Sequence, residues 1–167
     1  MREDEGRGTK DEGASPAALS SVSDVEPSGG EVVYGLDGAD VWRVAEPSHG
    51  VRGYRDLVAW QRAGDLVVAV YQASERFPTD ERFGLTAQIR RAAVSVPSNI
   101  AEGWGRQSKG EYAQFVRYAR GSLYEVETQI LLAQRLGFVG DAGAEAVLTP
   151  SAHVARLLRG LARHLRS

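Results

Sequence analysis

The strongest constraint on the fold is a helical repeat of apolar residues that runs from position 54 to position 165. Apolar side chains recur there at intervals of three and four residues, in four segments separated by short turns that contain glycine or proline. Such a repeat gives each helix an apolar stripe, and four stripes of this length bury one another when the helices pack side by side. The sequence therefore predicts an all-α fold, an antiparallel up-down-up-down four-helix bundle with helices over roughly 54–77, 80–104, 108–136 and 141–166.

Prolines and caps set the expected limits of these helices. Pro78 is expected to end the first helix, because proline pushes the preceding residue out of the α region. Thr79 and Asp80 are good N-cap residues for the second helix. Pro97 and Pro150 fall inside the second and fourth segments. We expect Pro97 to kink its helix without ending it, and Pro150 to kink or split the last one.

The turns on either side of the third helix carry clear signals. Gly103 and Gly105 are expected to close the second helix. Ser108 and Glu111 have the spacing of a capping box, which predicts the start of the third helix. Gly137 is placed to end that helix in the left-handed conformation.

The first helix differs from the others because it carries two apolar stripes. One comprises Leu57, Trp60, Gly64, Val67 and Tyr71, and the other comprises Val58, Leu66, Val70 and Phe77. So wide an apolar surface predicts burial on two sides, either within the bundle or against another subunit. The stripes of the later helices comprise Leu85, Ile89, Ala92, Val96 and Ile100; Tyr112, Phe115, Ala119, Leu123, Val126, Ile130 and Ala133; and Val154, Leu157, Leu158, Leu161 and Leu165.

Residues 1–53 have a different composition and are predicted to be an acidic, mostly disordered extension and linker, because residues 1–31 lack an apolar repeat. Residues 32–44 are more apolar and are a candidate short strand or docking segment. The extension holds 11 acidic and 5 basic residues, a balance of −6, whereas residues 54–167 hold 11 acidic and 15 basic residues, a balance of +4. This asymmetry indicates a polyanion partner or a tail that screens the domain, with solubility alone as the alternative.

Several classes of protein are excluded or disfavoured. The chain has no cysteine, which excludes disulfides, a thiolate nucleophile and a cysteine-based zinc site. No apolar run approaches the roughly 20 residues that span a bilayer, and the N-terminus lacks the apolar core of a signal peptide, so we expect a soluble cytoplasmic protein without a membrane partner. A di-iron bundle needs two Glu-x-x-His motifs, and the one match, Glu46 to His49, contains Pro47 and falls in the linker. There is no P-loop or nucleophile elbow, and no metal or cofactor is expected.

A series of short motifs is similar to those of a known family. The string S-V-P-S-N-I-A-E-G, from Ser95 to Gly103, resembles the signature of the four-helix-bundle proteins encoded in intervening sequences of bacterial 23S ribosomal RNA genes. Supporting motifs follow in order over roughly residues 54–165. They are Y-R-D-L with Trp60, F-P, Q-I-R-R-A, G-S-L-Y-E and L-G-F, which begin at Tyr54, Phe77, Gln88, Gly121 and Leu136.

The resemblance implies a four-helix bundle that assembles as a pentameric ring, with no enzymatic activity attached. Close relatives of that family, the accessory variability determinants of diversity-generating retroelements, are basic pentamers that bind nucleic acid and a reverse transcriptase. The implied partners are therefore further copies of the chain, nucleic acid, and a reverse transcriptase or other nucleic-acid enzyme.

Basic residues on helix faces are the candidate nucleic-acid contacts. One face of the last helix carries Arg156, Arg159, Arg163 and Arg166, which step by three, four and three residues. Arginine suits phosphate because its planar guanidinium donates paired hydrogen bonds. An ordinary solvated face is the alternative, although a ring would concentrate the positive potential by repeating the stripe. The other candidates are Arg90, Arg91, Arg106, Lys109, Arg117 and Arg120.

Polar residues also lie near the apolar stripe of the second helix. A ligand site formed by Asn99 and Glu102 is one interpretation, but structural hydrogen bonding is favoured, either to the carbonyl freed by Pro97 or across a helix or subunit contact. The residues of the signature and its neighbouring motifs to which a structural role is assigned are Gln88, Ser95, Pro97, Asn99, Glu102, Gly103 and Glu125. Ser98 and Glu127 have the same ambiguity.

One catalytic pattern remains. Arg159 and His164 resemble the R-x4-6-H motif of the HEPN ribonucleases, in which histidine would be the general acid or base and arginine would stabilise phosphate charge. The spacing is weak evidence, since Arg43 and His49 match it too. The leading prediction is a non-enzymatic oligomeric bundle that binds RNA or DNA through basic helix faces, as an adaptor for a nucleic-acid enzyme. A protein–protein scaffold is the first alternative and a ribonuclease the second.

Overall fold

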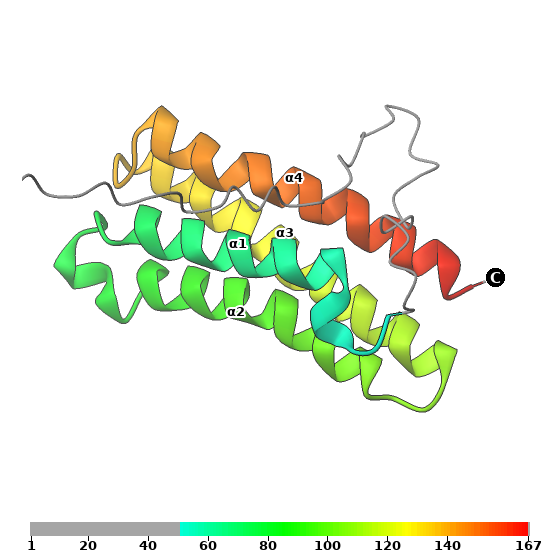
Figure 1. Ribbon diagram of the computed structural model, residues 1–167. Helices are drawn as coiled ribbons and strands as arrows, with labels where there is room; N and C mark the ends of the chain where they lie inside the picture. The colour runs from blue at the N-terminus through cyan, green and yellow to red at the C-terminus, as the bar shows by residue number, and fades with distance from the viewer. Residues whose placement is uncertain (1–50, 167) are drawn as a thin grey trace, which may run out of the picture. The chain divides into compact units, whose positions relative to one another are not determined.

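The computed structural model describes residues 51–166, and these form an up-down-up-down four-helix bundle (Figure 1). Each helix packs against the next along the chain, and the fourth closes against the first. The helices are α1 (Val58–Ser74), α2 (Leu85–Trp104), α3 (Lys109–Arg135) and α4 (Asp141–His164), with 3-10 turns η1 (Tyr54–Asp56) and η2 (Thr79–Arg82). The predicted all-α bundle is confirmed, and no strand occurs between residues 51 and 166. The predicted acidic extension lies outside the described residues up to position 50.

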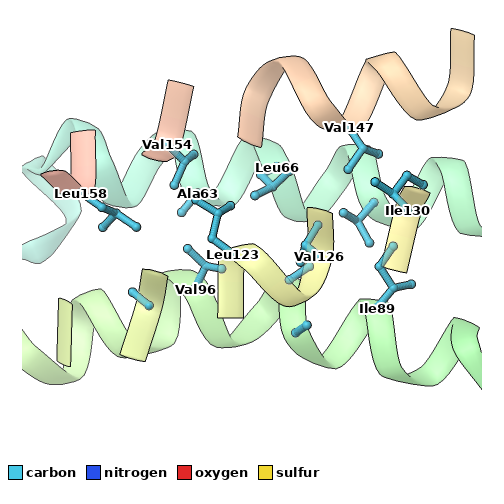
Figure 2. Close-up of a cluster of buried hydrophobic side chains, with 14 of the residues drawn as sticks. Ala63, Leu66, Ile89, Val96, Leu123, Val126, Ile130, Val147, Val154 and Leu158 are labelled. Atoms are coloured by element: carbon cyan, nitrogen blue, oxygen red, sulfur yellow. The ribbon is translucent and has the colours of Figure 1, made fainter. Parts of the chain in front are cut away.

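The core is an apolar column to which all four helices contribute (Figure 2). Its largest fully buried side chains include Leu66, Ile89, Ile100, Leu123, Ile130 and Leu158. Burying each such side chain stabilises the fold by about 1.5–3 kcal/mol. The predicted stripes of α2, α3 and α4 therefore form the core, with only Leu85, Phe115, Leu161 and Leu165 partly exposed at the margins.

The bundle buries one of the two predicted stripes of α1 almost fully and the other only in part. Of the two predicted stripes, the one with Leu66, Val70 and Phe77 is buried. The stripe from Leu57 to Tyr71 lies at the margin, partly buried for four residues and exposed at Tyr71. Its place in the core is taken by Ala59, Ala63 and Ala73. Apolar periodicity gives weight to large side chains and does not indicate these alanines, which are small enough to fit between neighbouring helices in the core.

The first helix is shorter at both ends than the predicted range of 54–77. Leu57 is extended (φ −73°, ψ 121°), so the preceding residues form the separate turn η1, in which the backbone N–H of Arg52 donates to Asp56 Oδ2 at 2.9 Å. At the other end the regular helix stops at Ser74, and the Phe77 N–H donates to the Ser74 carbonyl at 3.3 Å. Pro78 then blocks continuation, as expected.

The prediction that Thr79 and Asp80 cap the second helix is wrong. They belong to η2, and α2 begins only at Leu85, five residues after the predicted start at position 80. Gly84 interrupts the helical path with φ −94° and ψ −122°. Glu81 supplies the missing acceptor, because its Oε2 takes a hydrogen bond from the Leu85 N–H at 2.8 Å.

The predicted caps of α3 are confirmed. Ser108 Oγ accepts from the Glu111 N–H at 3.2 Å and donates to Glu111 Oε2 at 2.9 Å. At the other end Gly137 is left-handed with φ 76°. The Gly137 N–H donates to the Gln134 carbonyl at 3.0 Å and the Phe138 N–H to the Ala133 carbonyl at 2.9 Å, the hydrogen-bond pattern of a Schellman motif.

Gly103 has a packing role as well as its position near the end of α2. It is buried, and a Cβ built there would lie 2.5 Å from Tyr112 Cδ2 and 2.8 Å from Phe115 Cβ. Both neighbours belong to α3, so only glycine lets α2 and α3 approach this closely beside the turn that joins them. The glycine of the signature string therefore fixes the helix spacing at this end of the bundle.

We predict that Gly103→Ala destabilises the bundle by about 1–3 kcal/mol, because the added methyl group overlaps side chains of α3. Gly121→Ala is the matched control, since it lies in mid-α3 with no atom within 4 Å of the new Cβ, and it should stabilise by up to about 1 kcal/mol through helix propensity. Urea unfolding followed by circular dichroism measures both. Equal stability of the two variants would contradict the close-approach role.

Candidate nucleic-acid interface

The basic face of α4 is the clearest charged feature of the described chain. Arg156, Arg159 and Arg163 are all exposed and lie on one side of the helix, opposite the buried residues Val154 and Leu158. Over these seven residue steps the helix rises about 10 Å, which equals about three phosphate steps of one duplex strand. The predicted stripe therefore exists as an accessible surface.

Packing of α4 against α1 extends this surface. Arg62 of α1 and Arg156 of α4 line a shallow depression of about 430 Å³ together with His153, Asp65, Thr149 and Pro150. Arg62 is exposed and was not among the predicted candidates, and the contact between α1 and α4 brings it beside Arg156. We call Arg62, His153, Arg156, Arg159 and Arg163 the α1–α4 basic surface.

The arginines of this surface shift the pKa values of two neighbouring titratable groups. The pKa of His153 is lowered from its ordinary 6.5, first by burial and then by the positive charges of Arg156 and Arg62. Glu127 of α3 lies near Arg159: burial raises the pKa of this carboxyl, and the attraction of Arg159 partly opposes that rise. Asp65 pairs with Arg62 at 3.0 Å. Carboxylates thus moderate the positive potential without removing it.

Two of the remaining basic candidates, Arg90 and Arg106, contact aromatic rings within the chain. Arg90 Nε donates to Ser74 Oγ at 2.7 Å, and its guanidinium lies 4.7 Å from the centre of the Tyr71 ring, so it joins α2 to α1. Arg106 pairs with Glu102 and stacks 4.6 Å from the Phe115 ring centre.

Three further arginines bond within their own helices. Arg117 bonds to Gln114, Arg120 donates to the Tyr124 hydroxyl at 3.3 Å, and Arg166 Nε donates to the Ala162 carbonyl at 3.2 Å. Arg91 and Lys109 are exposed. The ten predicted residues thus lie on α2, α3 and α4, in the α2–α3 turn and, for Arg166, just past the end of α4. Arg156 lies beside another exposed arginine, Arg62, and Arg106 and Lys109 line one pocket.

The polar signature residues bond within α2. Ser95 Oγ donates to the Arg91 carbonyl at 2.9 Å, and Ser98 Oγ donates to the Val94 carbonyl at 2.8 Å. Asn99 Nδ2 donates to the Ser95 carbonyl at 2.8 Å. These acceptors differ from the carbonyl of Ala93, which Pro97 frees, and they lie on the same helix. Within the chain these side chains therefore bond to their own helix, and the predicted bond across a subunit contact stays a prediction. Gln88 and Glu125 are exposed, and Pro97 is partly buried.

Neither proline breaks its helix: α2 continues through Pro97 and α4 through Pro150. The split suggested for the last helix does not occur. This continuity matters for the site, because it keeps Thr149 and His153, on either side of Pro150, on one rigid element beside Arg62.

Residues 51–166 carry few signs of other chemistry. No group of three or more histidine, aspartate or glutamate side chains there is placed to hold a metal ion. No helix in this range is both long and apolar enough to cross a membrane. The Glu46–His49 and Arg43–His49 patterns lie outside the described residues.

These features define a class, a helical bundle with a basic outer face and a structural signature on its second helix. In a comparison with protein families, the model of the family described as 23S rRNA-intervening sequence protein matches residues 55–160. The chain belongs to this family, as the motifs predicted. A search of curated proteins finds no match.

We predict that Arg156→Gln raises the pKa of His153 toward 6.5, because removing a neighbouring positive charge makes protonation easier. Burial lowers the His153 pKa more than Arg156 does, so the pKa of the variant should stay below 6.5. The shift is measured by NMR titration of the imidazole. Arg166→Gln, at the far end of the same helix, is the control and should leave the His153 pKa unchanged, whereas an equal shift in both variants would contradict the local effect.

Proposed function

We propose that the chain is a non-enzymatic, self-associating bundle that binds nucleic acid through the α1–α4 basic surface. The observation that carries this proposal is the exposed row of Arg156, Arg159 and Arg163 with Arg62 beside it. Guanidinium groups on a rigid helix can contact successive phosphates without an ordering cost for the backbone. Family membership agrees with a bundle and leaves its ligand open.

The charge of the domain sets the character of this binding. A balance of +4 over residues 54–167 is modest, so one subunit would bind weakly. Contacts to phosphate carry no base information, and the affinity is therefore non-specific and falls steeply with salt. A ring would present several copies of the surface to one polyanion and raise the overall affinity by multivalency.

The triple variant Arg156→Gln, Arg159→Gln, Arg163→Gln should weaken RNA binding at about 50 mM salt by about tenfold or more, and it should lower the slope of log affinity against log salt by about 2 for single-stranded RNA. Fluorescence anisotropy with a labelled oligonucleotide over a salt series measures both quantities. The matched control is Arg76→Gln, Arg82→Gln, Arg135→Gln, which removes the same charge from exposed positions at the opposite end of the bundle.

If the two triple variants lose affinity equally, net charge rather than this surface governs binding. If the unaltered protein shows no binding at about 50 mM salt, the proposed function fails, and a protein–protein scaffold becomes the better hypothesis. That scaffold would be supported by a protein partner retained after nuclease treatment. The same pull-down tests whether a reverse transcriptase or another nucleic-acid enzyme is the partner of an adaptor.

Self-association is supported by apolar side chains that the bundle leaves outside its core. On α3 they are spread over the outward half of the helix, and α1 and α2 add Val68 and Val94. Single exposed apolar residues are ordinary, but several on the outward side of one helix indicate an interaction face. The exposed members are Tyr118, Tyr124, Leu131 and Leu132 on α3 and Leu136 at its C-cap. We propose that these faces meet between copies in a homopentamer, the assembly that the family resemblance implies.

Leu132→Glu should shift the mass in solution toward the monomer while leaving helix content unchanged, because the new carboxylate would be buried only in the assembly. Light scattering at micromolar concentration and circular dichroism provide the two readouts. Ala142→Glu, an exposed position at the start of α4, is the control and should keep the mass of the unaltered protein. A monomeric unaltered protein would contradict the proposed ring.

The ribonuclease alternative receives little support from geometry. Arg159 and His164 are five residues apart, so their directions differ by about 140° around the helix. Arg159 lies near Glu127 of α3, whereas His164 lines a pocket at the end of the bundle with Leu57 and Val58 of the α1 start. Retention of any RNA cleavage in His164→Ala would contradict a catalytic histidine, and absence of cleavage by the unaltered protein would end this hypothesis.

A further inference from the structure

An apolar pocket of about 530 Å³ opens at the end of the bundle where α1 begins and α4 ends. The turn between α2 and α3 completes its wall. Most of the lining is apolar, and its residues come from the start of α1, the end of α2, the start of α3 and the end of α4. They include Leu57, Val58, Trp104, Leu157, Leu161 and Leu165. A pocket of this size and character matches those that hold ligands or large side chains.

The wall and rim of this pocket also carry polar groups. Tyr112 lines it, and burial raises the pKa of its hydroxyl to about 12. The hydroxyl is buried and has no hydrogen-bond partner among residues 51–166. A buried hydroxyl without a partner is unfavourable, and a peptide carbonyl entering the pocket would supply an acceptor. Arg106, Lys109 and His164 lie around the same pocket, which favours an occupant with negative charge.

The path of the chain points to such an occupant. Val51, the first described residue, itself lines the pocket, so the residues before it are tethered at its mouth. Residues 32–44, V-V-Y-G-L-D-G-A-D-V-W-R-V, are the most apolar part of the preceding sequence and include Asp37 and Asp40. Position 44 lies seven residues before Val51, so its reach is up to about 25 Å. A short tether of this kind gives an effective concentration on the order of millimolar.

We propose that residues 32–44 of the same chain dock in this pocket, with Trp42 as the apolar anchor and the acidic side chains toward Arg106 and Lys109. Tryptophan is the largest side chain of the segment, and it combines a large apolar area with a single polar N–H. Val41 and Val44 flank it in the sequence and add apolar surface. This docking does not depend on the proposed function, because its residues are distinct from the α1–α4 basic surface.

Photocrosslinking in the full chain tests this docking. The residue p-benzoylphenylalanine, which is aromatic like tryptophan, replaces Trp42, and the crosslinked positions are mapped by mass spectrometry. We expect crosslinks concentrated on the pocket residues Leu57, Leu157, Leu161 and Leu165, in a product that migrates as a single chain on a denaturing gel. The control adds Val41→Asp and Val44→Asp, which keep the length of the tether and alter no residue of 51–166, and should reduce the pocket crosslinks at least fivefold.

Two outcomes would overturn the proposal. Pocket crosslinks that persist unchanged with Val41→Asp and Val44→Asp would mean that the tether alone, rather than apolar docking, brings position 42 to the pocket. A crosslinked product that migrates as a dimer would mean that the segment contacts another copy. Both results leave nucleic-acid binding untouched, so this proposal can fail while the proposed function stands.

Discussion

Mutual burial of four apolar stripes is the interaction on which the rest of this structure depends. Isolated helices of this length are marginal in water, so each helix persists because its neighbours cover its apolar face. The core residues are mainly branched aliphatic side chains, with alanine and glycine where helices come closest. Once that column is packed, the direction of every outward side chain is fixed, including the arginines of α4.

The family signature is explained largely by this packing. Ser95, Ser98 and Asn99 bond to carbonyls of their own helix around Pro97, and Gly103 permits the close approach of α3. The polar residues of this string therefore have mainly a structural role in α2. The exposed arginines of the α1–α4 basic surface lie outside this string, on α4 and on the part of α1 that packs beside it.

The two ends of the bundle differ in character. At one end, the turns are closed by regular hydrogen bonds such as the Schellman motif at Gly137. At the other end, α1 and α4 leave an apolar pocket beside the start of the described chain. Apolar surface is left outside the core both there and along α3.

The sequence by itself determined the four helices, their order and most of the core, because a repeat of three and four residues encodes which side of a helix is buried. It also determined the α3 caps, which depend on interactions between near neighbours in the chain. It misplaced the start of α2, which begins only after Gly84, and it left Ala59, Ala63 and Ala73 out of the core of α1, because hydropathy gives weight to large side chains. Only the tertiary structure decided that Arg62 joins Arg156, that Arg90 binds Ser74, and that a pocket opens beside Val51. Those are contacts between different helices, and no local pattern specifies them.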